Sequence, residues 1–389
     1  MREQAGQVKI TREQFARQLA LLRRRRLLLL PVLGALLAPL IAFLCFSCSG
    51  PVAQVKPPLE LPGETPGLIL RVGGDIMLAG VMAEHIYAWG PDFPFRRISE
   101  FLAEADFCYA GLETPLSDTG SPLPGKPLTL TAAPEAVQSL NSSGLALVGL
   151  ASDHLMDYDE AALMQTISLL EEAGIGYMGA GENEAAAVKP YSVSQKGLRV
   201  ALLDFCENAG IFFSYQYPKA LAAGENEAGV ANLEEEAVLA ALAEARRNHD
   251  VVVLNLHWGE EFSDTPNNAQ RKLAHSFIDG GADVIVGRHS HCLQGVETYN
   301  NGLIIYSLGN LVYGQQSSRL AREAALLELE LTALGWKSAR LFPLLLSEEG
   351  QPALAADKEA KDIITRLRAL SSGLNANLTA EGDTLKISR

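Results

Sequence analysis

Cysteine is scarce in this sequence, with five in 389 residues, and their spacing does not form a disulfide framework. Cys108, Cys206 and Cys292 are scattered singly through the body of the chain, which is typical of buried, small apolar residues. Cys45 and Cys48 form the only C-x-x-C. Because this pair lies in an apolar segment without a second pair, we interpret it neither as a zinc ribbon nor as a thioredoxin-type motif.

Several common catalytic and nucleotide-binding signatures are also missing. The chain has no Walker A, H-E-x-x-H or G-x-S-x-G motif. Residues 174–179, GIGYMG, match G-x-G-x-x-G, but they follow a predicted helix and lead into a predicted strand. This order is the reverse of a dinucleotide site, so we do not expect a nucleotide there.

Basic residues are few outside the N-terminus. The net charge is −14, yet residues 1–26 carry eight Arg or Lys against two Glu, so the rest of the chain carries −20. A strongly acidic body argues against nucleic acid as a partner, because phosphate binding needs a basic surface. A hydrophobic content of 48% in a chain of this length predicts one large or two ordinary globular domains.

The first 67 residues are predicted to anchor the protein in the cell membrane. Residues 27–47, LLLLPVLGALLAPLIAFLCFS, carry no charge and are long enough for a single transmembrane helix. The basic segment 1–26 then stays in the cytoplasm by the positive-inside rule, and the chain beyond the Pro- and Gly-rich linker at 48–67 lies outside. Two alternatives remain: a cleaved signal peptide, or a lipid anchor on Cys45 or Cys48.

The rest of the chain alternates between strands and helices. We expect strands at 68–72, 107–110, 145–150, 175–178, 200–205, 251–256, 282–286 and 303–306. Helices are expected at 98–105, 134–141, 160–173, 234–247 and 267–279. This alternation predicts an α/β domain, with a largely parallel sheet covered by helices, over residues 68–320. Residues 321–389 are expected to complete it with two strands, a helix at 357–370 and a last strand at 384–387.

Polar side chains of one chemical kind follow five of the predicted strands. They are Asp75, Glu113, Asp153 with His154, His257, and His289 with His291. Because ligands bind at the carboxyl ends of strands in sheets of this type, these side chains are expected to converge. Carboxylates and imidazoles without thiolates suit zinc, manganese or iron. The number of groups predicts one or two divalent metal ions, two being the natural count if a carboxylate bridges them.

Each of these residues also has an ordinary structural interpretation. Asp75 fits a turn after two glycines, Asp153 fits a helix cap, and Glu113 fits a solvated loop charge. We assign His85, His249 and His275, on predicted helices or at their ends, to such structural roles. The metal hypothesis therefore depends on the joint occurrence of the set, each member after an apolar run.

The motifs together resemble one known family. They are GGDIML (73–78), GLETPL (111–116), LASDHLMDY (150–158), GIGYMGAGEN (174–183), LHWGEEF (256–262), GADVIVGRHSHCLQ (281–294) and YSLGNLVY (306–313). They are similar to the CapA family of poly-γ-glutamate capsule biosynthesis proteins, within the calcineurin-like metallophosphoesterases. The resemblance implies a four-layer α/β/β/α sandwich with its site at the strand ends. It also implies a role in making, exporting or anchoring an anionic cell-surface polymer.

The chain departs from the family's usual pattern at several positions. Met77 stands where the superfamily has a histidine, as in the CapA branch, and Gly111 replaces an Asn. Asp153 replaces another Asn, which keeps an oxygen ligand and adds negative charge. In the last motif Arg288 and Ser290 stand in for the usual His and Pro. The arginine is expected to clamp a carboxylate or phosphate of the substrate.

These observations lead to a functional hypothesis: a metal-dependent hydrolase outside the membrane. His154 and Glu113 are the expected catalytic residues, and Arg288, Trp258 and Asn310 are expected to bind substrate. The bond attacked would be a phosphoester or a γ-glutamyl amide, in an anionic polymer or a small substrate. The alternative is a non-catalytic accessory subunit that works with polymer synthase or export proteins. A third hypothesis is a cell-wall or spore-related role without a capsule.

Overall fold

The computed structural model describes residues 67–211, 213–217, 219–314 and 318–389. The predicted basic segment, the membrane anchor and nearly all of the linker lie outside these residues. Within the described ranges, no helix is both long enough and apolar enough to cross a membrane. The described residues, from Gly67 onward, belong to one compact unit.

The larger sheet has ten strands and is mixed. Its order is β17-β18-β15-β14-β1-β2-β3-β4, with β13 also paired to β1 and β16 to β15. The strands β1, β2, β3, β4 and β13 run parallel, whereas β14 folds back antiparallel beside β1. Their bounds are β1 Leu68–Met77, β2 Phe107–Leu112, β3 Leu147–Gly149, β4 Gly176–Met178, β13 Asn310–Tyr313, β14 Glu323–Thr332, β15 Gly335–Leu346, β16 Pro352–Leu354, β17 Asn377–Glu381 and β18 Thr384–Ser388.

The smaller sheet has six strands in the order β11-β12-β10-β9-β7-β6. The four central strands are parallel, and the two edge strands are antiparallel to their neighbours. The bounds are β6 Tyr191–Gln195, β7 Leu198–Cys206, β9 Val251–His257, β10 Val284–Arg288, β11 Val296–Tyr299 and β12 Gly302–Ile305; a separate pair joins β5 Ala180–Gly181 to β8 Gly229–Val230.

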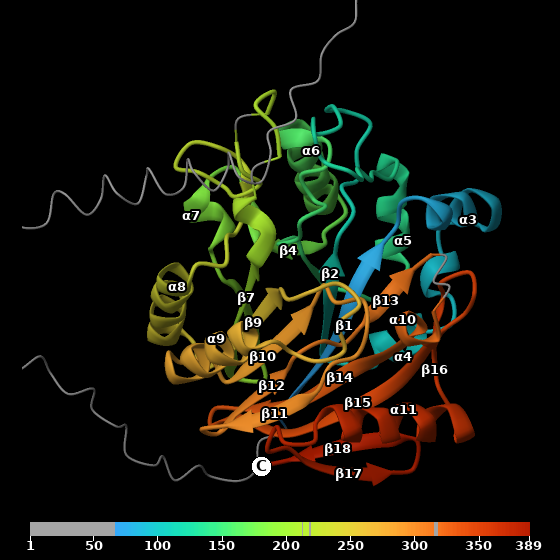
Figure 1. Ribbon diagram of the computed structural model, residues 1–389, viewed down its shortest axis with the longest axis vertical. Coiled ribbons are helices and arrows are strands. Elements are labelled where there is room, and N and C mark those ends of the chain that lie inside the picture. The colour runs from blue at the N-terminus through green and yellow to red at the C-terminus, as the bar shows by residue number, and fades with distance from the viewer. Residues whose placement is uncertain (1–66, 212, 218, 315–317) are drawn as a thin grey trace, which may run out of the picture. The chain divides into compact units, whose positions relative to one another are not determined.

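The two sheets face each other, and helices cover their outer faces (Figure 1). Alternate side chains explain this layering. On β9, Val251 and Val253 pack with β1 between the sheets, whereas Val252 and Leu254 pack outward against α8 and α9. Both faces of such a strand are buried, so its sequence is almost continuously apolar.

Of the longer helices, α6, α8 and α9 lie on the outer faces, whereas buried residues of α11 belong to the hydrophobic cluster between the sheets. Buried residues of α6 pack on the outer face of the larger sheet, and those of α8 and α9 pack on the smaller one. Their bounds are α3 Val81–Trp89, α4 Ser99–Ala103, α5 Val137–Asn141, α6 Asp159–Glu172, α7 Glu184–Ala187, α8 Glu235–Asn248, α9 Asn268–Asp279, α10 Arg319–Arg322 and α11 Asp357–Leu370.

The mixed α/β class predicted from the sequence is confirmed, but the expectation of one largely parallel sheet is wrong. There are two facing sheets, and antiparallel strands from residues after 320 extend the larger one. The carboxyl ends of β1, β2, β3, β9 and β10 nevertheless lie close together, and the candidate site is built there.

Candidate metal centre

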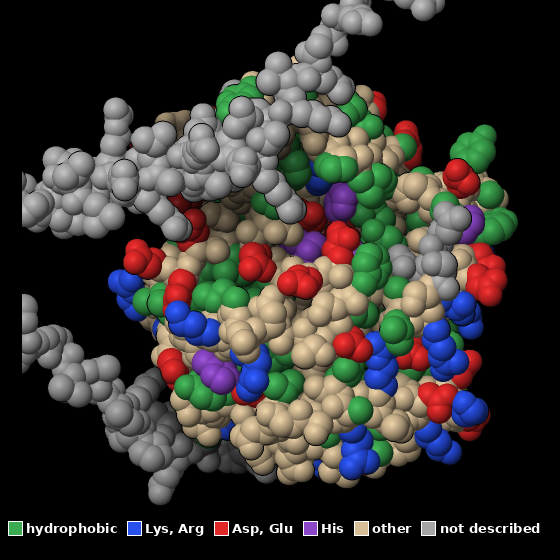
Figure 2. All heavy atoms as spheres, in the orientation of Figure 1, with side chains coloured by type: hydrophobic (Ala, Val, Ile, Leu, Met, Phe, Trp, Pro, Cys, Tyr) green, Lys and Arg blue, Asp and Glu red, His purple; other side chains and the backbone are tan. Residues whose placement is uncertain are grey.

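Five of the seven predicted ligands fall into groups that could share a metal ion at the strand ends. Among the described residues, Asp153 and His154 belong to neither group, so their role as ligands stays a prediction. Asp75 lies near the end of β1, and Glu113 directly follows β2. His257 is the last residue of β9, and His289 directly follows β10. The side chains of Asp75, Glu113 and His257 are 0% exposed. On the face drawn in Figure 2, acidic and histidine side chains gather in one hollow.

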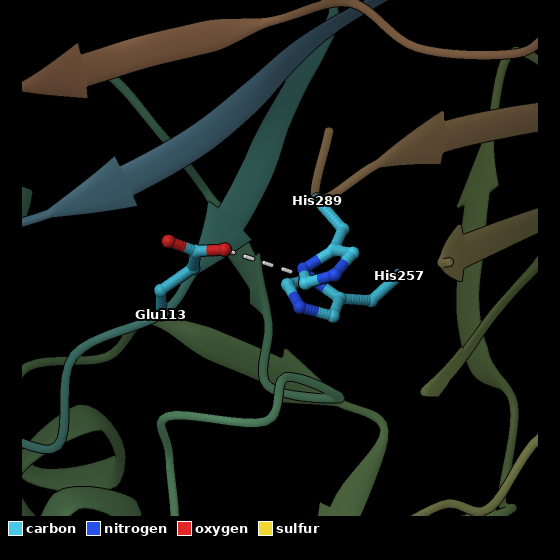
Figure 3. Close-up of side chains that lie close together, drawn as sticks. All are labelled: Glu113, His257 and His289. Carbon is cyan, nitrogen blue, oxygen red and sulfur yellow. Dashed lines mark ion pairs between the residues drawn. The ribbon is translucent and has the colours of Figure 1, made fainter. Parts of the chain in front are cut away.

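Two groups of these side chains are close enough to hold a metal ion. One consists of Glu113, His257 and His289, and the other of Asp75, Glu113 and His291; in each, the potential ligand atoms lie within 4.8 Å of one another. Figure 3 shows Glu113 pointing from the end of β2 toward the two imidazoles of the first group, with Oε1 3.6 Å from Nδ1 of His257. Glu113 is thus shared by both groups.

The Glu113 carboxylate fits a metal ligand better than a structural residue. Both of its oxygens are buried without a hydrogen-bond partner in the described residues, and so is Nδ1 of His289. Burial, reinforced by the neighbouring charges of Asp75 and Asp153, raises the pKa of Glu113 well above its ordinary value. An unpartnered buried carboxylate is unfavourable, and a bound cation would remove that penalty.

The loop after β10 is held in an unusual backbone conformation. His289 has φ 89° and His291 has φ 54°, in the left-handed region that side chains other than glycine seldom adopt. The backbone N–H of His289 donates to Oδ2 of Asp75 at 2.8 Å, which ties this loop to β1. Such local strain often marks functional sites, so it supports a role for this loop beyond connection.

Asn310, at the start of β13, orients His291. Its side-chain oxygen lies 3.0 Å from Nδ1 of His291, and its amide nitrogen donates to the carbonyls of His291 and Ala321 at 3.3 and 3.1 Å. The amide oxygen therefore accepts the Nδ1 proton and leaves Nε2 free as a ligand atom. That Asn310 also binds substrate stays a prediction.

His257 lies between an acidic and a basic side chain. Its Nε2 is 3.0 Å from Oδ1 of Asp153, and Nη1 of Arg288 lies 2.9 Å from its Nδ1. Burial and the nearby His289 lower the pKa of His257 to about 3, so the ring is neutral. The pKa of Asp153 is held well below its ordinary value: burial opposes the shift, but the hydrogen bond to His257 outweighs it.

Arg288 does not point into open space. Its Nη2 donates to both carboxylate oxygens of Asp204 at 3.0 and 2.9 Å and to the carbonyl of Ala151 at 2.6 Å, while Nη1 lies 3.3 Å from Oδ1 of Asp75. Burial raises the pKa of Asp204 to about 6, although Arg288 opposes the shift. That Arg288 clamps a substrate anion stays a prediction. In the structure its guanidinium N–H groups donate to protein atoms.

Asp204 did not figure in the sequence-based site. A signal for it exists, because an aspartate inside the apolar strand VALLDFC must find a partner once both faces of the strand are buried. The partner, Arg288, is 84 residues away, so the sequence alone does not identify it.

Asp157 and Lys126, which the sequence-based site did not include, support His154. Nδ1 of His154 is 2.7 Å from Oδ2 of Asp157, and the other oxygen of Asp157 accepts from Lys126. Lys126 also donates to the carbonyl of Asp153 at 2.5 Å. The Asp157 carboxylate is 0% exposed, so this contact fixes the imidazole and leaves its Nε2 available.

Trp258 lies deeper than expected. Its side chain is 1% exposed, and the indole N–H donates to the carbonyl of Tyr306 at 3.1 Å. A direct substrate contact by Trp258 stays a prediction. The ring of Phe262, by contrast, is 63% exposed and its centre lies 5.7 Å from that of the His291 ring.

The matching family model and the curated relatives agree on one family. The model of the family described as "Bacterial capsule synthesis protein PGA_cap" matches residues 69–315. "Capsule biosynthesis protein CapA" of Bacillus anthracis is 30% identical over 331 residues, 83% of this chain and 78% of the relative. A "Probable polyglutamine synthesis accessory protein" of Mycobacterium tuberculosis is 27% identical over 216 residues, 53% of this chain and 55% of the relative. A phosphatase structure from Mycoplasma pneumoniae aligns over 74% of this chain and 96% of its own, at 10% identity and a TM-score of 0.47.

Proposed function

The chain belongs to the PGA_cap family of bacterial capsule synthesis proteins, as its motifs indicated, and we propose that it is a metal-dependent hydrolase that acts on an anionic capsule polymer or its precursor. The proposal includes the predicted anchor at residues 27–47, which would hold the domain outside the cytoplasm. It also includes a metallophosphoesterase-like use of the strand-end site.

One observation carries the proposal: Glu113 is buried, with no hydrogen-bond partner among the described residues, between two sets of imidazole and carboxylate ligands. A bound cation would favour the charged form of this carboxyl and offset the cost of burying it. The residues that would hold a divalent metal are Asp75, Glu113, His257, His289 and His291. Their oxygen and nitrogen atoms suit zinc, manganese or iron.

The surrounding residues support hydrolysis rather than storage of an ion. A divalent metal, when bound, supplies Lewis acidity that makes water a nucleophile near neutral pH. His154 is fixed by Asp157 with one nitrogen free, which suits a group that gives a proton to the leaving atom of the substrate. Lys126 holds the far side of Asp157 and thereby keeps that imidazole in one orientation.

The charge of the domain bears on the substrate. Residues after 26 carry −20, so an anionic polymer would be repelled unless a cation lies between them. A metal in this hollow supplies that cation. The substrate class that follows is a phosphoester or a γ-glutamyl amide flanked by negative charge.

The test compares substitutions in the purified full-length chain. Glu113→Gln and His291→Ala are expected to abolish hydrolysis of a phosphodiester probe or of poly-γ-glutamate, measured by released product. His275→Ala is the matched control, because His275 contacts Glu297 at 2.8 Å and belongs to neither ligand group. Full activity of the Glu113 and His291 variants on a substrate cleaved by the wild type would refute the proposal.

A non-catalytic accessory role is the second candidate. The name of the Mycobacterium relative favours it, since that protein is described as an accessory of polymer synthesis. In that case the cleft would bind polymer for synthase or export proteins. Cells carrying His291→Ala, with the variant present at the normal level, then still make capsule; loss of capsule argues for the hydrolase.

A further inference from the structure

We propose that the Arg288 guanidinium takes the place of one of the two metal ions, so that the centre holds a single divalent ion on Asp75, Glu113 and His291. This inference rests on the proposed metal-dependent function and refines it. It makes Arg288 a permanent positive charge of the site, and it removes His257 from the set of ligands.

The hydrogen bonds of His257 carry the first step. A neutral imidazole has one N–H and one lone pair. Arg288 has only N–H groups to offer, so at 2.9 Å its Nη1 donates to the lone pair of Nδ1. The proton of His257 therefore lies on Nε2, where it donates to Asp153 at 3.0 Å. Both ring nitrogens are occupied, and neither is left to bind a metal.

The position of Arg288 is built into the fold. A Cβ atom added at Gly111 would lie 2.7 Å from Cδ of Arg288, and one at Gly149 would lie 2.6 Å from Oδ2 of Asp204. Both glycines are on the strands under the site, so side chains there would displace the ion pair. Because Asp204 and the Ala151 carbonyl also fix the guanidinium, it cannot swing away to admit a second ion without leaving a buried carboxylate unpaired.

The other ligand group is left free. In the part of the chain that the structure describes, neither oxygen of Glu113 has a hydrogen-bond partner, and Asn310 takes only the Nδ1 side of His291. Asp75 accepts single hydrogen bonds from Arg288 and from the His289 backbone, which leaves further lone pairs on its oxygens. This group therefore offers three ligand atoms to one metal ion. The fixed guanidinium of Arg288 beside it would repel a second metal ion.

The experiment counts metal in the purified full-length chain after loading with zinc or manganese and removal of the excess. The wild type is expected to hold one equivalent. The double variant Arg288→Met/Asp204→Asn removes the guanidinium without stranding its carboxylate, and it is expected to gain a second equivalent. Arg288→Lys keeps the charge, and Asp204→Asn keeps the arginine, so both controls are expected to hold one.

A second measurement does not depend on the Arg288 variants folding. Metal titration of His257→Ala is expected to give an affinity within about threefold of the wild type, whereas His291→Ala is expected to lose a hundredfold or more. Equal losses in the two variants overturn the inference.

The stoichiometry separates this inference from the proposed function. Two equivalents in the wild type, or one in the folded double variant, overturn the inference and leave a metal-dependent hydrolase standing. No metal in the wild type under any loading condition removes the proposed function itself.

Discussion

Glu113→Gln should change the stability of the protein in opposite directions with and without metal. The substitution keeps the shape of the side chain and removes its charge. In the metal-free protein the native carboxyl group is buried, has no hydrogen-bond partner within the described ranges and lies near the carboxylates of Asp75 and Asp153. Relief of that burden is expected to stabilise the metal-free variant by about 1 kcal/mol, the low end of the 1–3 kcal/mol range for an unsatisfied buried group, because the new amide is itself unpartnered.

With metal the sign reverses. At a free metal concentration of about 100 times Kd, binding stabilises the wild type by about 2.7 kcal/mol. If loss of the Glu113 carboxylate weakens metal affinity about 100-fold, as much as the loss of a residue that only orients a ligand can cost, binding contributes only about 0.4 kcal/mol at the same concentration. The loaded variant is then about 1 kcal/mol less stable than the loaded wild type. Because the folded part of this chain has more than 300 residues, each kcal/mol shifts Tm by only about 1–2 °C.

The assay is thermal unfolding of the full-length chain with excess chelator and with excess metal. Glu297→Gln is the control, because this buried glutamate accepts from Tyr306 at 2.7 Å and contacts His275 at 2.8 Å. It is expected to lower Tm equally in both conditions. If Glu113→Gln lowers Tm by the same amount with chelator as with metal, the carboxylate is not a metal ligand and the reasoning fails.

Three further predictions concern the surroundings of the site. His289→Gly should be about 1–2 kcal/mol more stable than His289→Ala by chemical denaturation, because only glycine adopts φ 89° without strain. Gly111→Ala should destabilise the wild type by about 1–3 kcal/mol, since its Cβ would lie 2.7 Å from Arg288, but should have little effect in an Arg288→Ala background. Asp157→Asn should lower kcat tenfold or more with little change in KM, because it releases His154, whose contribution as a proton donor is about 10²–10⁴-fold; an unchanged kcat would count against that role.

Local signals in the sequence predicted several elements well. The helix expected at 267–279 is observed as α9, Asn268–Asp279. Asn267 caps it and forms a reciprocal capping box with Gln270, so the start of this helix is determined by residues three positions apart. The strands at 251–256 and 303–306 are likewise recovered to within one or two residues, because both of their faces are buried and their sequences are continuously apolar.

Non-local contacts explain what the sequence did not reveal. The first strand was expected to end at residue 72, before Gly73 and Gly74, but β1 continues to Met77. A Cβ on Gly74 would lie 1.8 Å from the carbonyl of Gly309, so the glycines permit the backbone that leads into β13 to approach. That approach involves residues 235 positions apart. In a single sequence, the same dipeptide is indistinguishable from a turn.

In the candidate site, too, local features were predictable from the sequence and non-local contacts were not. The type of each ligand and its place after a strand were predictable, because the carboxyl ends of neighbouring parallel strands lie at one edge. Which of these side chains approach one another, and which are already hydrogen-bonded, depended on pairs such as Arg288 with Asp204 that only the folded chain reveals.

Two departures from the family pattern can now be understood as one structural change. Gly111 replaces an Asn of the family pattern, and Arg288 was expected to clamp a carboxylate or phosphate of the substrate. In the structure a side chain at 111 would collide with the guanidinium, so the glycine is the condition for the arginine to reach Asp75 and His257. Asp204, in turn, is the condition for a buried arginine to be tolerated. The effect of a substitution at position 111, 204 or 288 should therefore depend on which residues occupy the other two positions.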